Sequence, residues 1–302
     1  MPYVAGIDAG GTKTVALLAD ETGKVCAKTR GGGANLVVEG ELGVEKVLYD
    51  VIEGLDAPEP LAALCLGIAG ADRPSDRELL RGVLRRLGQR EAVRIENDAY
   101  IALVAGSPEG TGIVVVSGTG SVAYGVDAHG AKARSGGWGY LLGDEGSAYW
   151  LGHAAVRRGI RAADGRDQPT TLGERIGRKL GLEVPAGLVS WFYDQERFRH
   201  RVAELAYLVE EAAADGDASA AELLDHAAHH LALAARAVDR QLELSEPYRL
   251  VLSGGAFRAC PSLCRRIEGR LDLPLARVAR LAAEPAVGAV TLALDSLRGR
   301  KG

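Results

Sequence analysis

Near its N-terminus the chain reads Gly6-Ile-Asp-Ala-Gly-Gly-Thr-Lys-Thr14. An apolar run from Tyr3 to Ile7 leads into the glycines, and a second apolar run follows them from Val15 to Leu18. This order predicts a strand, a tight turn and a returning strand, and the turn signal Glu21-Thr-Gly-Lys24 adds a third strand. The segment therefore predicts an antiparallel start to a sheet. Its glycine turn would let backbone N–H groups approach an anion without obstruction by Cβ atoms.

The same device occurs twice more along the chain. Val116-Ser-Gly-Thr-Gly-Ser121 follows the apolar run Ile113 to Val116, and Ser253-Gly254-Gly255 follows the apolar run Tyr248 to Leu252. A glycine-rich hairpin without a ligand could explain one copy. Three glycine turns, each after an apolar strand, favour the binding of phosphate groups. Neither a Walker P-loop nor a Rossmann fingerprint fits, because a strand rather than a helix follows the first turn.

Composition limits the classes of protein to consider. A length of 302 residues is ample for two domains at ~150 residues each. The net charge of −4 argues against a nucleic-acid partner, because phosphate backbones require a concentrated basic surface. No apolar run approaches the ~20 residues of a membrane span, and the N-terminus lacks the pattern of a signal peptide. With four cysteines and no disulfide framework, we expect a cytoplasmic protein without a membrane partner.

The first two glycine turns suggest an internal duplication, and so two similar domains that face each other across a central cleft. We expect the first domain at residues 1–108 and the second at residues 109–284. Residues 145–241 are rich in Ala and Leu and predict a helical insertion in the second domain. Pro285 opens a last helix, and we expect residues 285–302 to pack back on the first domain.

These motifs resemble those of a known family. The three turns look like the phosphate-1, phosphate-2 and adenosine motifs of the sugar kinase/Hsp70/actin superfamily. The block Gly136-Gly-Trp-Gly-Tyr-Leu-Leu-Gly-Asp-Glu-Gly-Ser147 is similar to that of the BadF/BadG-type ATPase family and, within it, of the N-acetylglucosamine kinases. The resemblance covers essentially the whole chain. It implies an α/β fold of two ribonuclease H-like, actin-like ATPase domains, a homodimer, and transfer of phosphate from ATP to the 6-hydroxyl of an amino sugar.

The nucleotide and its metal are assigned to the glycine turns. Asp8, at the end of the first strand, would hold Mg²⁺ directly or through water, since this ion keeps several waters and few protein carboxylates. Alternatively, Asp8 hydrogen-bonds its own turn. Lys13 would add charge near the phosphates, or would simply be solvated. The resemblance implies that Thr12 and Thr119 contact the nucleotide. The full set of expected nucleotide-binding residues is Gly10, Gly11, Thr12, Lys13, Thr14, Gly118, Thr119, Gly120, Gly254 and Gly255.

Asp98 is the candidate catalytic base. It follows a short strand and precedes a helix, where it could orient the attacking hydroxyl and accept its proton. The competing interpretation is a helix N-cap, but Asn97 is an equally good cap. The sequence Asn97-Asp98-Ala99 also aligns with the pattern of the family. We therefore expect Asp98 to contact the acceptor sugar as the base.

The sugar pocket is assigned to the glycine-rich block and its neighbours. Trp138 lies between glycines and offers a flat face and an N–H donor, although it could instead cover the core. Asp144 would accept hydrogen bonds from sugar hydroxyls, or would cap the following helix in competition with Ser147. The resemblance further implies that Asn35, Ser121 and Gly137 contact the sugar.

Two other classes of protein are alternatives to the kinase. Activators of 2-hydroxyacyl-CoA dehydratases or benzoyl-CoA reductases resemble this chain, but they carry cluster-ligating cysteines, and this chain has no Cys between Cys65 and Cys260. An actin-like filament or ATP-gated regulator would have no use for Asp98 or for the Gly-Trp-Gly block. N-acetylglucosamine fits the resemblance best as the substrate. Glucosamine, N-acetylmuramate or a broad range of hexoses stay open.

The cysteines themselves give a simple expectation. Cys26 and Cys65 fall in apolar strands and are predicted to be core residues. Cys260 and Cys264 are predicted to lie one turn apart on a helix. Two such ligands do not make a structural zinc site, which is usually four-coordinate.

Overall fold

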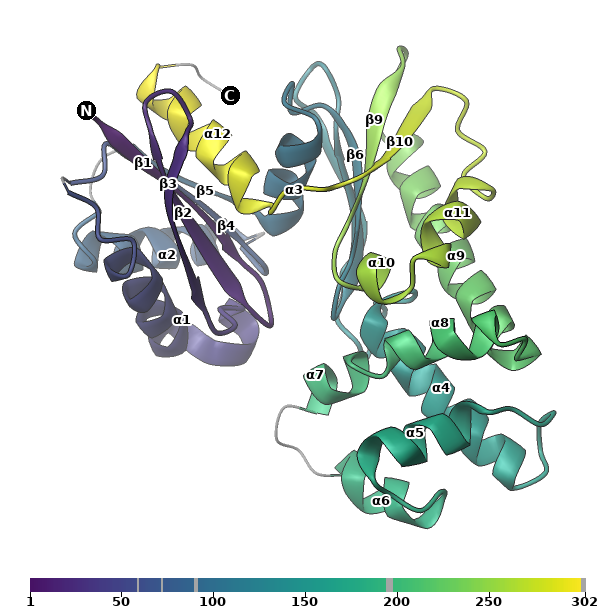
Figure 1. The fold of residues 1–302 in the computed structure, drawn as a ribbon. Coiled ribbons are helices and arrows are strands. Elements are labelled where there is room, and N and C mark those ends of the chain that lie inside the picture. The colour runs from purple at the N-terminus through teal and green to yellow at the C-terminus, as the bar shows by residue number, and fades with distance from the viewer. Residues whose placement is uncertain (59, 72, 90–91, 194–197, 300–302) are drawn as a thin grey trace. The chain divides into compact units, whose positions relative to one another are not determined.

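The computed structural model describes residues 1–58, 60–71, 73–89, 92–193 and 198–299 (Figure 1). The chain divides into two compact units. The first comprises residues 1–114, 125–130 and 281–302, and the second comprises residues 115–124 and 131–280. Within the described ranges, no helix is both long and apolar enough to cross a membrane.

The first unit is built on a five-stranded sheet in the order β3-β2-β1-β4-β5. The predicted antiparallel start is confirmed, because Asp8 of β1 pairs with Val15 of β2 in an antiparallel register. On its other side β1 is parallel to β4, which is parallel to β5. The carboxyl ends of these three parallel strands therefore meet at one edge of the sheet. The strands are β1 (Tyr3–Ala9), β2 (Thr14–Asp20), β3 (Val25–Gly31), β4 (Ala63–Ile68) and β5 (Val93–Asn97).

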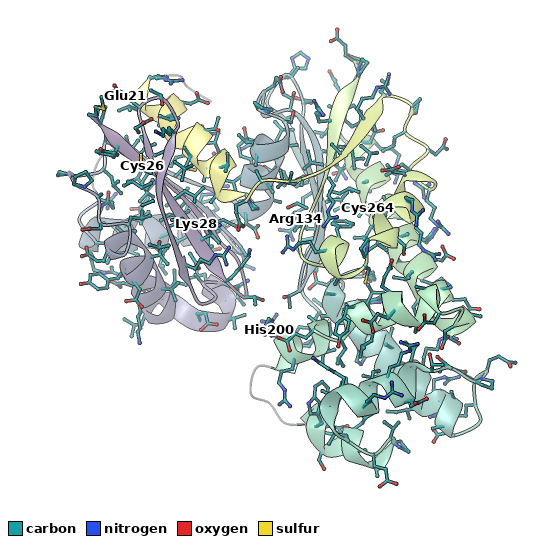
Figure 2. All side chains as sticks on the ribbon, in the orientation of Figure 1. Glu21, Cys26, Lys28, Arg134, His200 and Cys264 are labelled. Atoms are coloured by element: carbon teal, nitrogen blue, oxygen red, sulfur yellow. The ribbon has the colours of Figure 1, made fainter. Side chains whose placement is uncertain are left out.

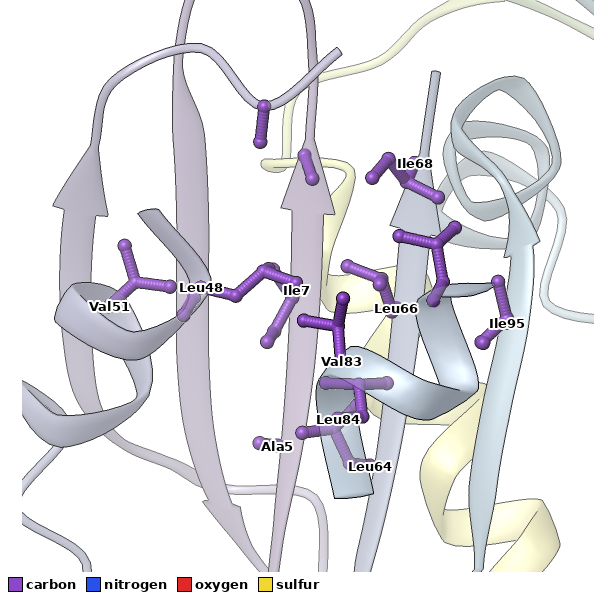
Figure 3. Close-up of a cluster of buried hydrophobic side chains, with 14 of the residues drawn as sticks. Ala5, Ile7, Leu48, Val51, Leu64, Leu66, Ile68, Val83, Leu84 and Ile95 are labelled. Carbon is purple, nitrogen blue, oxygen red and sulfur yellow. The ribbon is translucent and has the colours of Figure 1, made fainter. Parts of the chain in front are cut away.

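Helices cover both faces of this sheet. Because side chains alternate along a strand, Ala5 and Ile7 join one core with α1 and α2 (Figure 3). Gly6 faces the other way, where an added Cβ would lie 2.4 Å from the backbone nitrogen of Val290 in α12. Asp8 shares this second face. The helices are α1 (Leu36–Glu53), α2 (Pro74–Arg86), α3 (Asp98–Gly106) and α12 (Ala286–Leu297).

The second unit holds most of the other five-stranded sheet, whose order is β10-β9-β6-β7-β8. Its strands are β6 (Gly112–Ser117), β7 (Ser121–Val126), β8 (Lys132–Gly136), β9 (Tyr248–Ser253) and β10 (Ala276–Arg280). A run of helices separates β8 from β9, as the composition predicted, and α10 and α11 follow β9 (Figure 1). The helices are α4 (Ala148–Ala163), α5 (Leu172–Leu180), α6 (Ala186–Tyr193), α7 (Phe198–Ala203), α8 (Ala206–Ala214), α9 (Ala218–Asp239), α10 (Ala256–Ala259) and α11 (Ser262–Glu268).

Two of the cysteine predictions were wrong. Cys26 is exposed, because β3 is the edge strand and its residues are at most half-buried. Cys260 and Cys264 do not share a helix: Cys260 ends α10, and Pro261 intervenes before Cys264 in α11. Cys65 in β4 is buried, as predicted.

Candidate active site

The first glycine turn and the segment that contains Asn35 form one structure in the first unit. The backbone N–H of Ala34 donates to the carbonyl of Gly10 at 3.0 Å. A Cβ on Gly33 would stand 2.5 Å from the carbonyl oxygen of Gly11, so only glycine fits there. Asn35 caps α1, because its Oδ1 accepts from the backbone N–H of Val37 at 2.9 Å. The nitrogen of the same side-chain amide is left to donate to a ligand.

Thr14 has a structural part in this turn. It is fully buried, and its hydroxyl donates to the carbonyl of Gly32 at 2.8 Å. Its side chain thus connects the glycine run 31–33 to the start of β2. The neighbouring Gly11, Thr12 and Lys13 are exposed, and these are the positions from which a nucleotide could be contacted.

Asp8 and Asp98 interact electrostatically at the shared carboxyl edge of β1 and β5. Burial first, and then the negative charge of Asp98, raise the pKa of Asp8 to about 7. Lys13 opposes this increase, whereas the carboxylate of Glu284 adds to it. Negative charge around the pair of carboxylates therefore outweighs the positive charge of Lys13, and the oxygen donors of the pair suit Mg²⁺. No cluster of three metal-ligating side chains exists in the described ranges, so such an ion would depend on water and phosphate oxygens for its remaining ligands.

The structure separates the two roles that the sequence left open at the end of β5. Asn97 is the N-cap of α3, and its Oδ1 accepts from the backbone N–H of Ala99 at 2.9 Å. The same N–H group also donates to Asp98 Oδ1, at 3.0 Å. Because Asn97 caps the helix, Asp98 is not needed for that purpose, and it is only partly buried.

Lys13 is held by an ion pair rather than being simply solvated. Its Nζ lies 3.4 Å from Glu284 Oε2. Lys28, which is labelled in Figure 2, and Arg30 both lie on the edge strand β3. They contact the other oxygen of Glu284 at 2.9 and 3.3 Å. The hydrogen bond from Lys28 is the main reason that the pKa of Glu284 is lowered, although its partial burial opposes the shift. No sequence pattern singled out Glu284, which is distant from all three cations along the chain.

The second and third glycine turns touch each other in the second unit. Gly254, with φ of 118°, approaches β6 so closely that an added Cβ would be 2.1 Å from the carbonyl oxygen of Ser117. The turn after Ser117 is closed by a hydrogen bond from the N–H of Gly118 to the carbonyl of Gly120 at 2.9 Å. Ala148, at the start of α4, donates its N–H to the carbonyl of Gly118 at 2.8 Å. The two predicted nucleotide motifs thus adjoin.

Asp144 lies beside this turn. Its backbone is left-handed, with φ of 61°, and its side chain is only 7% exposed. Burial raises the pKa of Asp144, although the backbone N–H of Ser121 and the charge of Arg199 oppose the shift. The competing role as a helix cap is excluded, because Ser147 caps α4 and its Oγ accepts from the N–H of Trp150 at 3.1 Å. Asp144 is therefore a buried acid with no part in starting the helix.

The loop after β8 presents Trp138 to its surroundings. The Trp138 side chain is 68% exposed, so it does not cover the core. The guanidinium carbon of Arg134 lies 4.3 Å from the centre of its ring. Arg134 also donates from Nε to the carbonyl of Gly136 at 3.1 Å and from Nη2 to that of Gly137 at 3.3 Å (Figure 2). Nothing in the sequence singled out Arg134, which organises this loop.

Ser121 connects the phosphate-type turn to the same loop. Its hydroxyl donates to the carbonyl of Glu145 at 2.8 Å, and its N–H is a hydrogen-bond donor to the carboxylate of Asp144. The structure thus sorts the predicted residues into two groups. Asp8, the first glycine turn, Asn35 and Asp98 gather in the first unit. The second unit brings together Gly118, Thr119, Gly120, Ser121, Gly137, Trp138, Asp144, Gly254 and Gly255.

A model of one known protein family matches nearly the whole chain. The profile of the BadF/BadG/BcrA/BcrD ATPase family matches residues 5–293. The chain belongs to this family. The two mixed five-stranded sheets with their helices are the α/β architecture of actin-like ATPases, as expected.

Several relatives of this ATPase-family chain are known. An N-acetylmuramic acid/N-acetylglucosamine kinase of Clostridium acetobutylicum is 34% identical, over 97% of this chain and 98% of the relative. An N-acetyl-D-glucosamine kinase of Dictyostelium discoideum is 32% identical, over 96% and 97% of the two chains. Among solved structures, a candidate N-acetylglucosamine kinase of Chromobacterium violaceum is 27% identical, with a TM-score of 0.72 over 97% of this chain and 99% of the other.

Proposed function

We propose that the protein is an ATP-dependent kinase that phosphorylates the 6-hydroxyl of N-acetylglucosamine. The position of Asp98 carries this proposal: it follows β5, lies within electrostatic range of Asp8, and is relieved of helix capping by Asn97. A carboxylate in this position can orient a hydroxyl nucleophile and accept its proton. Full-length relatives that are named as kinases of N-acetylated amino sugars support the same conclusion.

In this reaction the sugar oxygen attacks the γ-phosphorus of ATP, and the bond from that phosphorus to the bridging oxygen of ADP breaks. Asp98 orients the hydroxyl and accepts its proton, an effect of typically ~10²–10⁴-fold. The backbone N–H groups of the glycine turns and the Lys13 ammonium hold the phosphates. Bound Mg²⁺, with Asp8 as a direct or water-mediated ligand, would neutralise charge on the transferred group.

We assign the contacts with the acceptor sugar to the residues that the sequence singled out. Trp138 offers its exposed face to the sugar ring, and the carboxylate of Asp144 accepts from a ring hydroxyl. Asn35, Ser121 and Gly137 complete the set, with Asn35 donating from its side-chain amide. A site built from such hydrogen bonds rejects analogues that lack the matching hydroxyl far better than apolar contact can.

The proposal is tested by measuring ADP release with a panel of acceptors: N-acetylglucosamine, glucosamine, glucose and no sugar. We expect the highest kcat/KM with N-acetylglucosamine, and phosphate on the 6-oxygen of the product. ADP release that does not depend on any sugar would overturn the proposal and favour an ATPase activator or regulator. The homodimer and the cytoplasmic location expected from the sequence stay predictions.

A further inference from the structure

Arg199 lies against the glycine-rich loop of the second unit, and among the described residues its hydrogen-bond donors have no partner. It belongs to the short helix α7, and its guanidinium carbon is 5.2 Å from the centre of the Tyr140 ring. In the described part of the chain, no carboxylate or carbonyl group forms a hydrogen bond or ion pair with it. Arg134, by contrast, donates hydrogen bonds to the loop carbonyls of Gly136 and Gly137. Arg199 is thus a cation that contacts the loop through the Tyr140 ring without forming a hydrogen bond to a described loop residue.

The charge of Arg199 is felt at the carboxylate that is assigned to the sugar. Its positive charge lowers the pKa of Asp144, against the larger effect of burial, while Glu145 has the opposite effect from the loop itself. Arg199 therefore lies close to the place where a hydroxyl of the acceptor would bind.

A row of rings fixes the place of this guanidinium. Tyr140 meets Tyr149 of α4 edge to face, with centroids 5.2 Å apart, and Tyr149 stacks on His153 at 5.8 Å. His153 in turn contacts Phe192 of α6 at 5.6 Å. Because Tyr140 is braced by the helical insertion, the cation above it has a defined position. An aromatic ring can hold a guanidinium while its N–H groups stay directed at a ligand.

We propose that Arg199 binds a carboxylate on the acceptor, so that the enzyme also takes amino sugars whose ring hydroxyl carries an acidic ether substituent. This inference rests on the proposed function and extends it. A guanidinium has five N–H donors in a planar fork that matches a carboxylate, which a neutral hydroxyl pocket does not require. N-acetylmuramic acid, the 3-O-lactyl ether of N-acetylglucosamine, is the acceptor of this class. The relative from Clostridium acetobutylicum is named for both sugars.

The test compares these two sugars, which differ only in the acidic substituent, in the wild type and in Arg199→Met. Losing a hydrogen-bonded charge pair should lower kcat/KM for N-acetylmuramic acid about tenfold or more, mainly through KM. The value for N-acetylglucosamine should stay within about twofold. The methyl ester of N-acetylmuramic acid, which lacks the negative charge, should be insensitive to the variant.

The matched control is Arg201→Met on the same helix. Arg201 lies 5.0 Å over the ring of Trp191, outside the loop, and its loss should affect both sugars equally or not at all. Retained activity on N-acetylglucosamine shows that Arg199→Met is folded, and Arg199→Gln provides a second variant. An equal loss for both sugars, or a wild type active on N-acetylglucosamine but not on N-acetylmuramic acid, would overturn the inference. A wild type inactive on both sugars would instead contradict the proposed function.

Discussion

The α-carbon of Gly120 lies against the carboxylate of Asp144: a side-chain carbon at residue 120 would be 2.8 Å from Asp144 Oδ2. The turn after β6 and the loop that contains Asp144 therefore pack directly against each other. Asp144 also receives a hydrogen bond from the N–H of Ser121, the next residue along the turn. A change in either segment is thus expected to affect the other, and under the proposed function this contact would couple acceptor binding to nucleotide binding.

Gly120→Ala tests this contact. The added methyl group must displace the buried carboxylate of Asp144, because its carbon would lie 2.8 Å from Oδ2 and 3.3 Å from Oδ1. We expect the KM for the sugar to rise about tenfold, the size of effect that small misplacements of binding groups produce. Gly82→Ala is a suitable control, since the nearest atom to its added Cβ is a flexible Arg86 nitrogen at 3.7 Å. Steady-state kinetics that show equal sugar KM values for the two variants would refute the importance of the contact between Gly120 and Asp144.

Arg134→Met tests the organisation of the Trp138 loop. The variant removes two hydrogen bonds to loop carbonyls and the stacking partner of the indole. Hydrogen bonds from charged groups contribute ~1.5–3 kcal/mol each at most, so we expect sugar KM to increase about tenfold while kcat at saturating sugar changes less. In a Trp150→Phe, Trp191→Phe background, the emission of Trp138 should also shift. An unchanged emission spectrum and KM would show that the loop holds its shape without Arg134.

Asp8→Asn tests the proposed metal contact. Removing one charge from the Asp8–Asp98 pair should weaken the attraction for Mg²⁺, so the concentration of Mg²⁺ that gives half-maximal binding of a fluorescent ATP analogue should rise severalfold. The readout is nucleotide binding, which does not require turnover. If the Mg²⁺ requirement for binding is the same as in the wild type, Asp8 serves its own turn instead.

Asp217 gives a pH-dependent contribution to stability in the helical insertion. Burial acts to raise the pKa of this carboxyl, but hydrogen bonds from Thr171, Thr170 and Ala220 outweigh it, so the net shift is downward. A depressed native pKa stabilises the fold above the unfolded-state value of about 3.9, and this stabilisation disappears as pH falls through the native value.

The corresponding measurement is urea unfolding of the wild type and Asp217→Ala. At pH 7 the variant should be less stable by about 1–2 kcal/mol, since it loses the N-cap of α9. The difference should shrink as the pH falls below the unfolded-state pKa of about 3.9 and approaches the lower pKa of the native carboxyl. A difference that is constant from pH 7 to pH 3 would contradict the assigned ionisation.

Local sequence signals predicted most of the fold. Apolar strands followed by glycine turns correctly located β1, β6 and β9, and Pro285 correctly marked the start of α12. Two strands had no such signal. β8 (Lys132–Gly136) and β10 (Ala276–Arg280) are polar strands at the sheet edges, where burial does not impose an apolar pattern. Cys26 was misjudged for the same reason, because β3 is an edge strand.

The candidate site was predictable where its residues lie in motifs, and unpredictable where a contact spans the chain. Asp8 lies near the end of a strand, Asp98 directly follows a strand, and Asp144 lies in a glycine-rich loop. Glu284 meets Lys13 across 271 positions of sequence, and Arg199 reaches Tyr140 from a separate helix. Such pairs depend on the tertiary fold, and neither residue carries a local pattern.

The kinetics of Asp98→Asn test the central claim most directly. If Asp98 accepts the proton of the attacking hydroxyl, kcat should fall by about 10² or more, while the dissociation constant for ATP stays nearly unchanged. Asn97→Ser, which preserves the helix cap, should keep most of the activity and serves as the control. An Asp98→Asn enzyme with the kcat of the wild type would contradict the account.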